Sequence, residues 1–379
     1  MWLPSLAKVL RNIGAGGAGR QSAGARGGGA ALDAAAPPPL CRGPMPHRSG
    51  WMAAALAALC LPGLAGCAPR VVPAGPPVAA PALAGDAILA ADGARLPLHH
   101  RAPPGGLPAR AVLLALHGFN DHAGNLLIDG FGQLAEAGVL TYAYDQRGFG
   151  ASPGRTLWPG AETMAEDAAL ALRLLRARHP GLPLYLLGES MGAAVAVLAV
   201  AGPAADSPPD GLLLMAPAFW SRRAIGPVAV GAFWLLAHSL PALAFPPGAG
   251  NISASDNTEA LRRFGRDPLT IKDTRIDAAW GLLGLMDAAS TRLAGCCAPP
   301  TLVLQGARDR VVPPSVTRGV LRGMRPETRL ARYAEGWHLL LRDGVRETVA
   351  ADILAWMADP TAPLPSGADA EGAAWLAAP

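Results

Sequence analysis

The fold is decided by residues 184–201, which read LYLLGESMGAAVAVLAVA. An apolar strand over 184–187 runs into the turn Gly188-Glu189-Ser190-Met191-Gly192, and an apolar helix over 193–201 follows. A strand-to-helix turn this tight brings backbone segments into near contact, so the positions two residues either side of Ser190 must carry minimal side chains. The turn therefore predicts that Ser190 stands on the crest of a sheet, at the positive end of a helix.

On either side of this turn, apolar runs alternate with helical patterns. Runs that are apolar on both faces are typical of parallel strands covered on both sides. Such runs lie at 111–116, 139–144, 212–215 and 301–304. Residues 162–179 carry apolar side chains at helical spacing before Pro180, which indicates an amphipathic crossover helix. The pattern predicts an α/β fold with a doubly wound, mostly parallel sheet, whose ligands bind at the carboxyl ends of the strands.

One long insertion, about 220–294, breaks this rhythm. It contains an apolar run over 224–245 that Pro227 and Pro241 interrupt, and the 13 residues between the prolines are too few to span a membrane. We expect a helical cap over the active site; the alternative is an ordinary helical excursion packed on the sheet edge. The α/β domain is expected over 87–358, starting with a hairpin at 87–100, and a flexible tail over 359–379.

A reactive serine needs a base, and the base needs an orienting acid. His338 follows the apparent strand 329–333, and Asp309 follows the strand 301–304. Each residue stands where a strand end would deliver it to the serine. We therefore expect His338 to accept the Ser190 proton and Asp309 to orient the imidazole.

Other roles are open to both residues. Asp309 precedes Arg310 and could form a surface ion pair, and His338 lies between apolar residues and could belong to the core. Asp343 and Asp287 are the remaining candidates for the acid.

The tetrahedral intermediate also needs donors for its oxyanion, and backbone N–H groups serve because they are preorganised. Met191, at the start of the helix, supplies one. The loop after the strand 111–116 should supply the other, and Phe119 is the best candidate. Losing one such donor typically costs roughly 3 kcal/mol in the barrier. In the same loop, His117 is expected to be a structural hydrogen-bonding residue.

These segments resemble the monoacylglycerol lipase and lysophospholipase branch of the α/β-hydrolases, the serine aminopeptidase S33-like family. The likeness covers about 87–356 and rests on three motifs: His117-Gly118-Phe119-Asn120-Asp121-His122, Asp145-Gln146-Arg147-Gly148-Phe149-Gly150-Ala151-Ser152, and Asn257 with Asp267-Pro268-Leu269. Asn120 and Asp121 depart from the usual Gly and Glu, and Gln146 and Phe149 replace two histidines. The family triad maps onto Ser190, Asp309 and His338.

The resemblance implies hydrolysis of carboxylic esters, of monoacylglycerols or lysophospholipids, through an acyl-enzyme on Ser190. It also implies an acyl chain held under the cap, where Phe233, Trp234 and Leu235 would suit it or would simply be core. The alternatives are a general short-chain carboxylesterase or thioesterase, and a non-catalytic envelope lipoprotein on the same fold. No cofactor or metal is expected, because no phosphate-cradling loop or metal spacing is present.

The N-terminal residues 1–67 differ in composition from the rest. They hold six basic side chains against Asp33 alone, which leaves 26 basic and 27 acidic residues in the remainder and argues against nucleic acid as a partner. Residues 1–44 are rich in Gly, Ala and Pro, which predicts disorder or a mis-assigned start. Residues 45–67 read as a signal peptide whose last four residues resemble a bacterial lipobox ending at Cys67.

Lipidation of Cys67 would anchor the protein in the bacterial cell envelope, followed by a Pro/Ala-rich tether over 68–86. Ala68 after the cysteine favours the outer membrane, because an aspartate there would suggest retention in the inner membrane. We expect a monomer. The adjacent Cys296 and Cys297 are expected to fill space unbridged, because vicinal bridges are strained.

Overall fold

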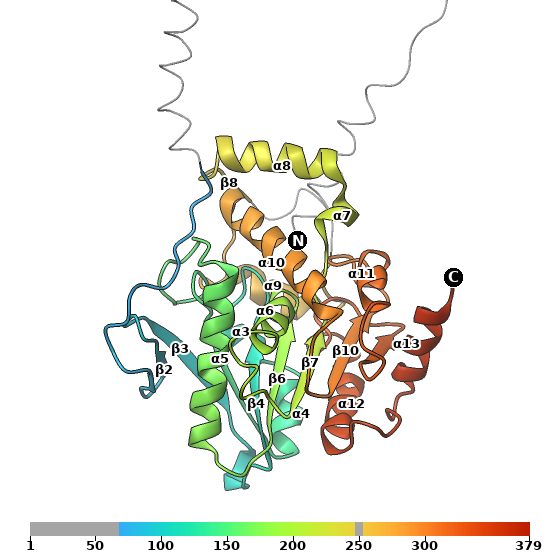
Figure 1. Ribbon diagram of the computed structural model, residues 1–379. Coiled ribbons are helices and arrows are strands. Elements are labelled where there is room, and N and C mark those ends of the chain that lie inside the picture. The colour runs from blue at the N-terminus through green and yellow to red at the C-terminus, as the bar shows by residue number, and fades with distance from the viewer. Residues whose placement is uncertain (1–67, 247–252) are drawn as a thin grey trace, which may run out of the picture.

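The computed structural model describes residues 68–246 and 253–379. Within these ranges the centre is a nine-stranded sheet of order β1-β2-β3-β5-β4-β6-β7-β10-β11 (Figure 1). The strands β4 to β7, β10 and β11 run parallel to one another, and β1, β2 and β3 pair antiparallel, β3 with β5 at the edge of the parallel part. The sheet confirms the predicted doubly wound α/β class. The strands are β1 (Ala82–Leu83), β2 (Ala87–Leu89), β3 (Arg95–Arg101), β4 (Ala111–Leu116), β5 (Val139–Tyr144), β6 (Leu184–Glu189), β7 (Gly211–Met215), β10 (Thr301–Gly306) and β11 (Arg329–Tyr333).

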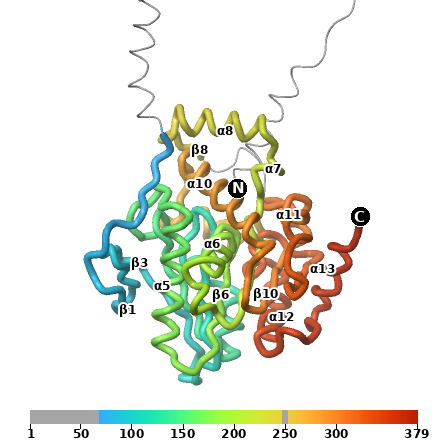
Figure 2. The backbone as a smooth tube through the Cα atoms, viewed as in Figure 1, coloured from blue at the N-terminus to red at the C-terminus, as the bar shows by residue number. Residues whose placement is uncertain are grey.

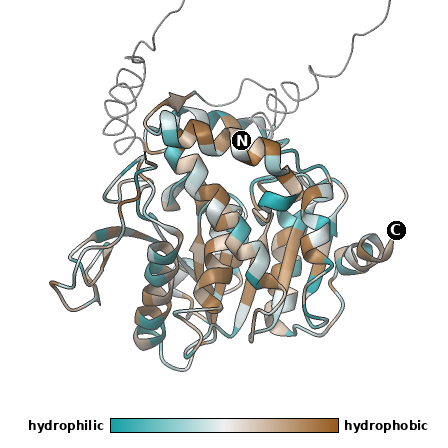
Figure 3. Cartoon of the chain, turned by 45° about the horizontal axis from the view of Figure 1, so that its top comes forward, coloured by the Kyte–Doolittle hydropathy of each residue, from teal (hydrophilic) through white to brown (hydrophobic). Residues whose placement is uncertain are grey.

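Helices cover both faces of this sheet. The even-numbered residues of β4 pack with α5 (Ala161–Arg178) and α6 (Met191–Val200) in one apolar core. Its odd-numbered residues pack with α4 (Phe131–Glu136) and α12 (Arg346–Ala358) in a second core. This alternation follows from the period of two along a strand. Figure 3 shows hydrophobic residues along the strands between these helices. Two short elements complete this part, the helix α3 (Ala123–Leu126) and the 3-10 turn η1 (Pro104–Gly106).

The described residues of the insertion between β7 and β10, 216–246 and 253–300, form four helices and a two-stranded ribbon over the carboxyl end of the sheet (Figure 2). Its long helix α10 packs on α6, and the backbone of Gly281 lies so close to Trp158 that a Cβ atom would overlap the indole ring. No helix of the described ranges is long and apolar enough to cross a membrane. The elements are α7 (Arg222–Ile225), α8 (Pro227–Ser239), β8 (Ala244–Phe245), α9 (Thr258–Arg266), β9 (Thr274–Arg275) and α10 (Ile276–Leu293).

The C-terminal region corrects the expectation of a flexible tail over 359–379. Helix α13 (Ala368–Ala377) lies against β11, and α11 (Pro314–Leu321) stands nearby. Arg329 pairs with Asp369 at 2.5 Å, and the backbone of Gly372 contacts that of Leu330. An uncovered edge strand is open to pairing with another chain, so α13 has a clear physical role as its cover.

The stiff tether predicted over 68–86 does not stand apart from the domain. Val72 donates its backbone N–H to the Trp158 carbonyl at 2.8 Å, and Gly75 donates to Asp92 at 3.0 Å. Strand β1 then pairs with β2, so the sheet begins before the predicted boundary at residue 87. Proline-rich composition suggested an extended chain correctly, but it carried no information about what that chain lies against.

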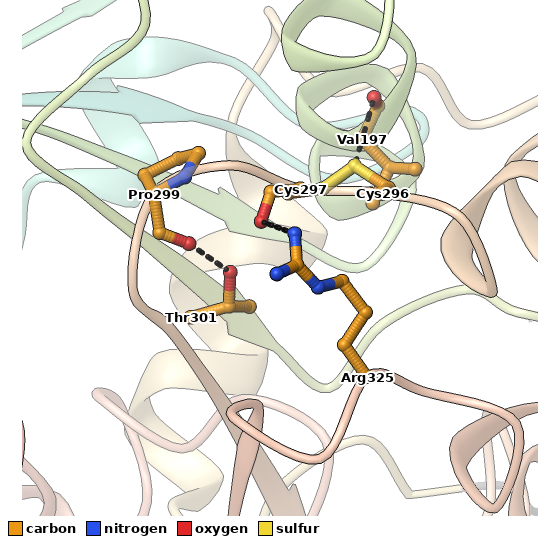
Figure 4. Close-up of a disulfide and its surroundings, with 6 residues drawn as sticks. All are labelled: Val197, Cys296, Cys297, Pro299, Thr301 and Arg325. Carbon is orange, nitrogen blue, oxygen red and sulfur yellow. Dashed lines mark hydrogen bonds between the residues drawn. A yellow bond between two sulfur atoms is a disulfide. The ribbon is translucent and has the colours of Figure 1, made fainter.

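The adjacent cysteines contradict the expectation that they stay unbridged. Cys296 and Cys297, between α10 and β10, form a disulfide (Figure 4). Cys296 is nonetheless buried, and its sulfur lies 3.9 Å from the Val197 carbonyl of α6. The pair therefore fills space beside the sheet, as expected, in the bridged form.

Candidate active site

The turn between β6 and α6 holds Ser190 in a conformation that few residues adopt. Its φ of 56° and ψ of −114° lie outside the favoured regions for an L-residue. A Cβ atom on Gly188 would overlap the Gly192 backbone, and one on Gly192 would overlap the carbonyl of Leu116 in β4. Both glycines are therefore required by close backbone approach, and the strained serine is presented at the carboxyl end of the sheet.

Asp309 and His338 meet at this same end. The Nδ1 atom of His338 lies 2.7 Å from Oδ2 of Asp309. The other carboxylate oxygen accepts the backbone N–H groups of Val311 at 2.8 Å and Val312 at 2.9 Å, which fixes the orientation of the carboxylate. Both side chains are buried, and His338 shares a cavity wall with Ser190. The structure thus brings the three predicted triad residues together.

The two predicted oxyanion donors line the same cavity. Among residues 68–246 and 253–379, the backbone N–H groups of Phe119 and Met191 have no protein acceptor. Because buried backbone donors are usually paired, two free donors beside a strained serine are available for a ligand oxygen.

His117 orders the loop that carries Phe119. Its Nδ1–H donates to the Gly118 carbonyl at 2.8 Å, and its Nε2 accepts the Gln146 backbone N–H at 3.0 Å. Complete burial lowers the pKa of His117, so the ring is neutral and fits this pair of bonds. Gln146, which replaces a histidine of the family motif, adds a bond from its amide to the His117 carbonyl at 2.8 Å.

The cavity in front of Ser190 has a volume of about 410 Å³ and walls that are mostly apolar. Its apolar lining comes from the cap and from loops at the strand ends: Phe119, Met191, Ala218, Trp220, Ala254, Leu261, Phe264, Ile271, Leu282, Met286, Val311, Val312 and Leu339. Phe233, Trp234 and Leu235 do not line this cavity, so the expected contact with the acyl chain is wrong and only Phe233 fits the alternative of a core residue. Phe233 packs edge-on against Trp280, and the other two side chains are largely exposed, because α8 lies on the outside of the cap.

Hydrogen bonds join the cap to the loop of Phe119. Asn120 donates to the Thr274 hydroxyl at 2.7 Å and accepts from the Ile271 backbone at 3.0 Å. His122 lies 2.9 Å from Asp267, the aspartate of the resembled Asp-Pro-Leu segment. These hydrogen bonds therefore fix the position of the cap relative to the loop that carries Phe119.

Comparison with known proteins agrees with this geometry. Residues 108–344 match the family described as serine aminopeptidase S33. The chain belongs to this family. A monoacylglycerol lipase from Mycolicibacterium smegmatis is 28% identical over 65% of this chain and 88% of its own length. A human monoglyceride lipase is 26% identical over 68% of this chain and 86% of its own.

A solved structure supports the fold of this S33 family member. It is a soluble variant of monoglyceride lipase from Saccharomyces cerevisiae in complex with a substrate analogue, with a TM-score of 0.60 and 17% identity. The match covers 76% of this chain and 97% of that one. The family signature segment Asp145–Ser152 is architectural here, because Asp145 accepts the backbone N–H groups of Ala123 at 2.9 Å and Ala151 at 2.8 Å.

Sequence reasoning missed a buried charge cluster behind the serine. Arg342 forms ion pairs with Asp121, at 2.9 Å, and with Glu189, the residue before Ser190. No local signal marked it, because Arg342 and Asp343 after Leu339-Leu340-Leu341 look like the ordinary polar end of an apolar run.

Two predictions of other sites stay open. Cys67, the expected lipidation site, lies outside the described residues. In the described ranges, no group of three or more His, Cys, Asp or Glu side chains is arranged to hold a metal ion.

Proposed function

We propose that this protein hydrolyses carboxylic esters of single-chain lipids, monoacylglycerols or lysophospholipids, through an acyl-enzyme on Ser190. The observation that carries the proposal is the 410 Å³ apolar cavity, which has Ser190, His338 and two free backbone donors on its wall. Such a cavity accepts a flexible acyl chain and leaves the carbonyl end beside the polar groups. The names of the relatives from M. smegmatis and human support the same substrate class.

The geometry gives each residue one task. Ser190 Oγ attacks the ester carbonyl carbon while His338 Nε2 takes the hydroxyl proton, and Asp309 stabilises the imidazolium that forms. The N–H groups of Phe119 and Met191 receive the oxyanion. His338 then protonates the leaving alcohol oxygen as the C–O bond breaks, which leaves the acyl group on Ser190. Water, activated by His338, releases the fatty acid and restores the serine.

The test is an assay of the full chain in detergent with three substrate types: long-chain 1-monoacylglycerols, lysophosphatidylcholine and p-nitrophenyl butyrate. We expect turnover of the monoacyl lipids that disappears in Ser190→Ala. Activity confined to the short ester would replace the proposal with a general carboxylesterase. A wild type that neither turns over any of the three nor reacts with a fluorophosphonate would support a non-catalytic lipoprotein.

We also infer that a lipid on Cys67 holds the protein at the bacterial outer membrane. The lipobox-like sequence ending at Cys67 is the basis, and the segment just after it lies against the cap. The Arg70 backbone N–H is 3.4 Å from Asp277, at the start of α10, and Val71 forms a bridge with Trp158. An anchor at residue 67 would therefore keep the cap close to the lipid surface.

The outer face of α8 supports this orientation. Val228, Trp234 and Leu235 on this helix are 75%, 49% and 60% exposed, and Leu240 and Leu243 are exposed in the turn that follows. Figure 1 shows α8 at the same end of the molecule as the start of the blue segment, which is the first described part of the chain. Exposed apolar side chains gathered in one segment are typical of a membrane-contacting surface.

Flotation with anionic lipid vesicles tests the anchor and the surface separately. Cells expressing the full chain should yield a protein that floats with vesicles, and Cys67→Ser should remove fatty-acid labelling and most flotation. The double variant Trp234→Ser with Leu235→Ser should keep the fatty-acid labelling of Cys67. Combined with Cys67→Ser, it should weaken the flotation that the unlipidated protein still shows. Equal labelling of the wild type and Cys67→Ser would refute the anchor.

A further inference from the structure

Arg342 occupies an unusual position for an arginine. It follows His338 by four residues, and its side chain is 2% exposed. Burying a guanidinium is unfavourable unless its charge and its hydrogen bonds are matched. Its partners therefore decide what the residue is for.

Those partners come from the two other loops of the catalytic centre. One guanidinium nitrogen donates to Asp121 at 2.9 Å, in the loop that carries the Phe119 donor. Another donates to Glu189, the residue directly before the nucleophile. Asp121 in turn accepts from the Asn125 side chain at 2.7 Å and from the His122 backbone at 2.9 Å. One planar guanidinium thus joins the loop of His338 (the histidine loop), the loop that carries Phe119 and the turn of Ser190.

The charges of the cluster agree with this role. The two carboxylates raise the pKa of Arg342, which stays a cation. The Arg342 charge lowers the pKa of Asp121, while burial raises that of Glu189. Buried ion pairs give little net stability compared with well-packed apolar side chains, so stability alone does not account for this cluster. The guanidinium does constrain the relative positions of the loops that carry its two acceptors, because its donor nitrogens are held in one rigid plane.

We propose that Arg342 is a positioning residue that holds Phe119, Ser190 and His338 in the relative placement that acyl transfer needs. The proposal rests on the proposed ester hydrolysis. Displacing a reacting group by about 1 Å can lower a rate roughly a hundredfold. Arg342→Lys keeps the positive charge but loses the planar pair of donor nitrogens, so the variant separates the effect of loop geometry from that of charge.

The chain offers a matched control in Arg147. Its guanidinium also bridges two aspartates, Asp92 at 2.7 Å and Asp167 at 2.6 Å, and it is buried, but it ties the first hairpin to α5 away from the cavity. Arg147→Lys removes a comparable fork whose acceptors, Asp92 and Asp167, lie outside the three catalytic loops. Any effect of general loosening should appear in both variants.

The experiment compares Arg342→Lys, Arg147→Lys and wild type by ester turnover and by the rate of fluorophosphonate labelling of Ser190. In Arg342→Lys we expect kcat and the labelling rate to fall by about 10- to 100-fold while KM stays within about threefold. In Arg147→Lys both rates should stay within about twofold of wild type at a similar loss of Tm. Glu189→Gln keeps the shape of the second acceptor and should give a smaller loss of kcat, which protects the test if Arg342→Lys does not fold.

Wild-type rates in folded Arg342→Lys, or equal losses in both lysine variants, would overturn the proposal. If Arg342→Lys does not fold, wild-type rates in Glu189→Gln have the same meaning. A wild type that labels but turns over none of the esters rejects only the proposed substrates, because the labelling rates still decide the role of Arg342. A wild type that does neither rejects both proposals.

Discussion

At the scale of single residues, hydrogen bonds fix the orientation of the side chains that surround Ser190. Asp309 shows this best, because one carboxylate oxygen accepts two backbone N–H groups and the other faces His338. The backbone bonds fix which oxygen meets the imidazole. The carboxylate therefore holds the histidine in the tautomer that can accept a proton from Ser190.

Asp309→Asn tests this assignment. The amide oxygen can still accept from Val311 and Val312, which turns the NH₂ group toward His338 and favours the wrong tautomer. We expect kcat to fall by about 10⁴ while Tm changes little. Steady-state kinetics and thermal unfolding would be measured together with Asp287→Asn, a change on the cap that should leave kcat near the wild-type value. A kcat within tenfold of wild type in Asp309→Asn would remove Asp309 from the triad.

The sequence could predict those catalytic residues whose role follows from the residues next to them in the chain. Ser190 lies between two glycines, and Asp309 and His338 each follow a strand. Arg342 was missed because its meaning depends on Asp121 and Glu189, which are far away in the chain and meet it only in the folded structure. Ion pairs of this kind leave no periodic pattern in a sequence.

At the scale of elements, the cavity depends on which face of each cap helix turns inward. Met286 of α10 lines the cavity, whereas Leu235 of α8 faces outward. The sequence of α8 is apolar almost throughout, so its pattern could not tell an inner face from an outer one, and the predicted acyl-chain residues were wrong. Strands β4 and β5 were predicted to the residue because continuous apolar runs bounded by polar residues have one simple interpretation.

Met286→Trp should shorten the acyl chain that the enzyme prefers. The indole would fill part of the cavity and exclude the far end of a long chain, so kcat/KM for a C16 monoacylglycerol should fall roughly tenfold or more. The value for p-nitrophenyl butyrate should stay within about twofold. Leu235→Trp makes the same change on the outer helix and serves as control. An unchanged chain-length profile in Met286→Trp would mean that the acyl chain lies elsewhere.

The C-terminal helix supports a second prediction at this scale. Removing residues 367–379 uncovers β11, and Arg329 and Arg332 lose their partners Asp369 and Glu371. We expect Tm to fall by about 5 °C or more, together with self-association in size-exclusion chromatography. Asp369→Asn with Glu371→Gln removes only the ion pairs and should lower Tm by far less, because partly exposed pairs contribute little. Equal effects of the two changes would assign the helix a purely electrostatic role.

At the scale of the whole molecule, buried carboxyl groups couple stability to pH. Asp343 lies beside the histidine loop, accepts from Trp337 at 2.6 Å and from the Ser255 hydroxyl, and its burial raises its pKa to about 7. An acid whose pKa is raised on folding binds more protons in the native state. The free energy of unfolding therefore falls as pH rises from the ordinary value of about 4 through 7. His117 works in the opposite direction, because its lowered pKa removes stability as pH falls below about 6.5.

Because these contributions overlap, the contribution of Asp343 is isolated by the difference between Asp343→Asn and wild type. The amide keeps an acceptor for Trp337 and a donor for Ser255, and it cannot ionise. We expect the Tm of the variant, relative to wild type, to rise steadily from pH 5 to pH 8, since only the wild type must bury a charge at the higher pH. Thermal unfolding across this range measures it. A constant difference would mean that Asp343 is ionised throughout, and that its two hydrogen bonds outweigh the unfavourable effect of burial.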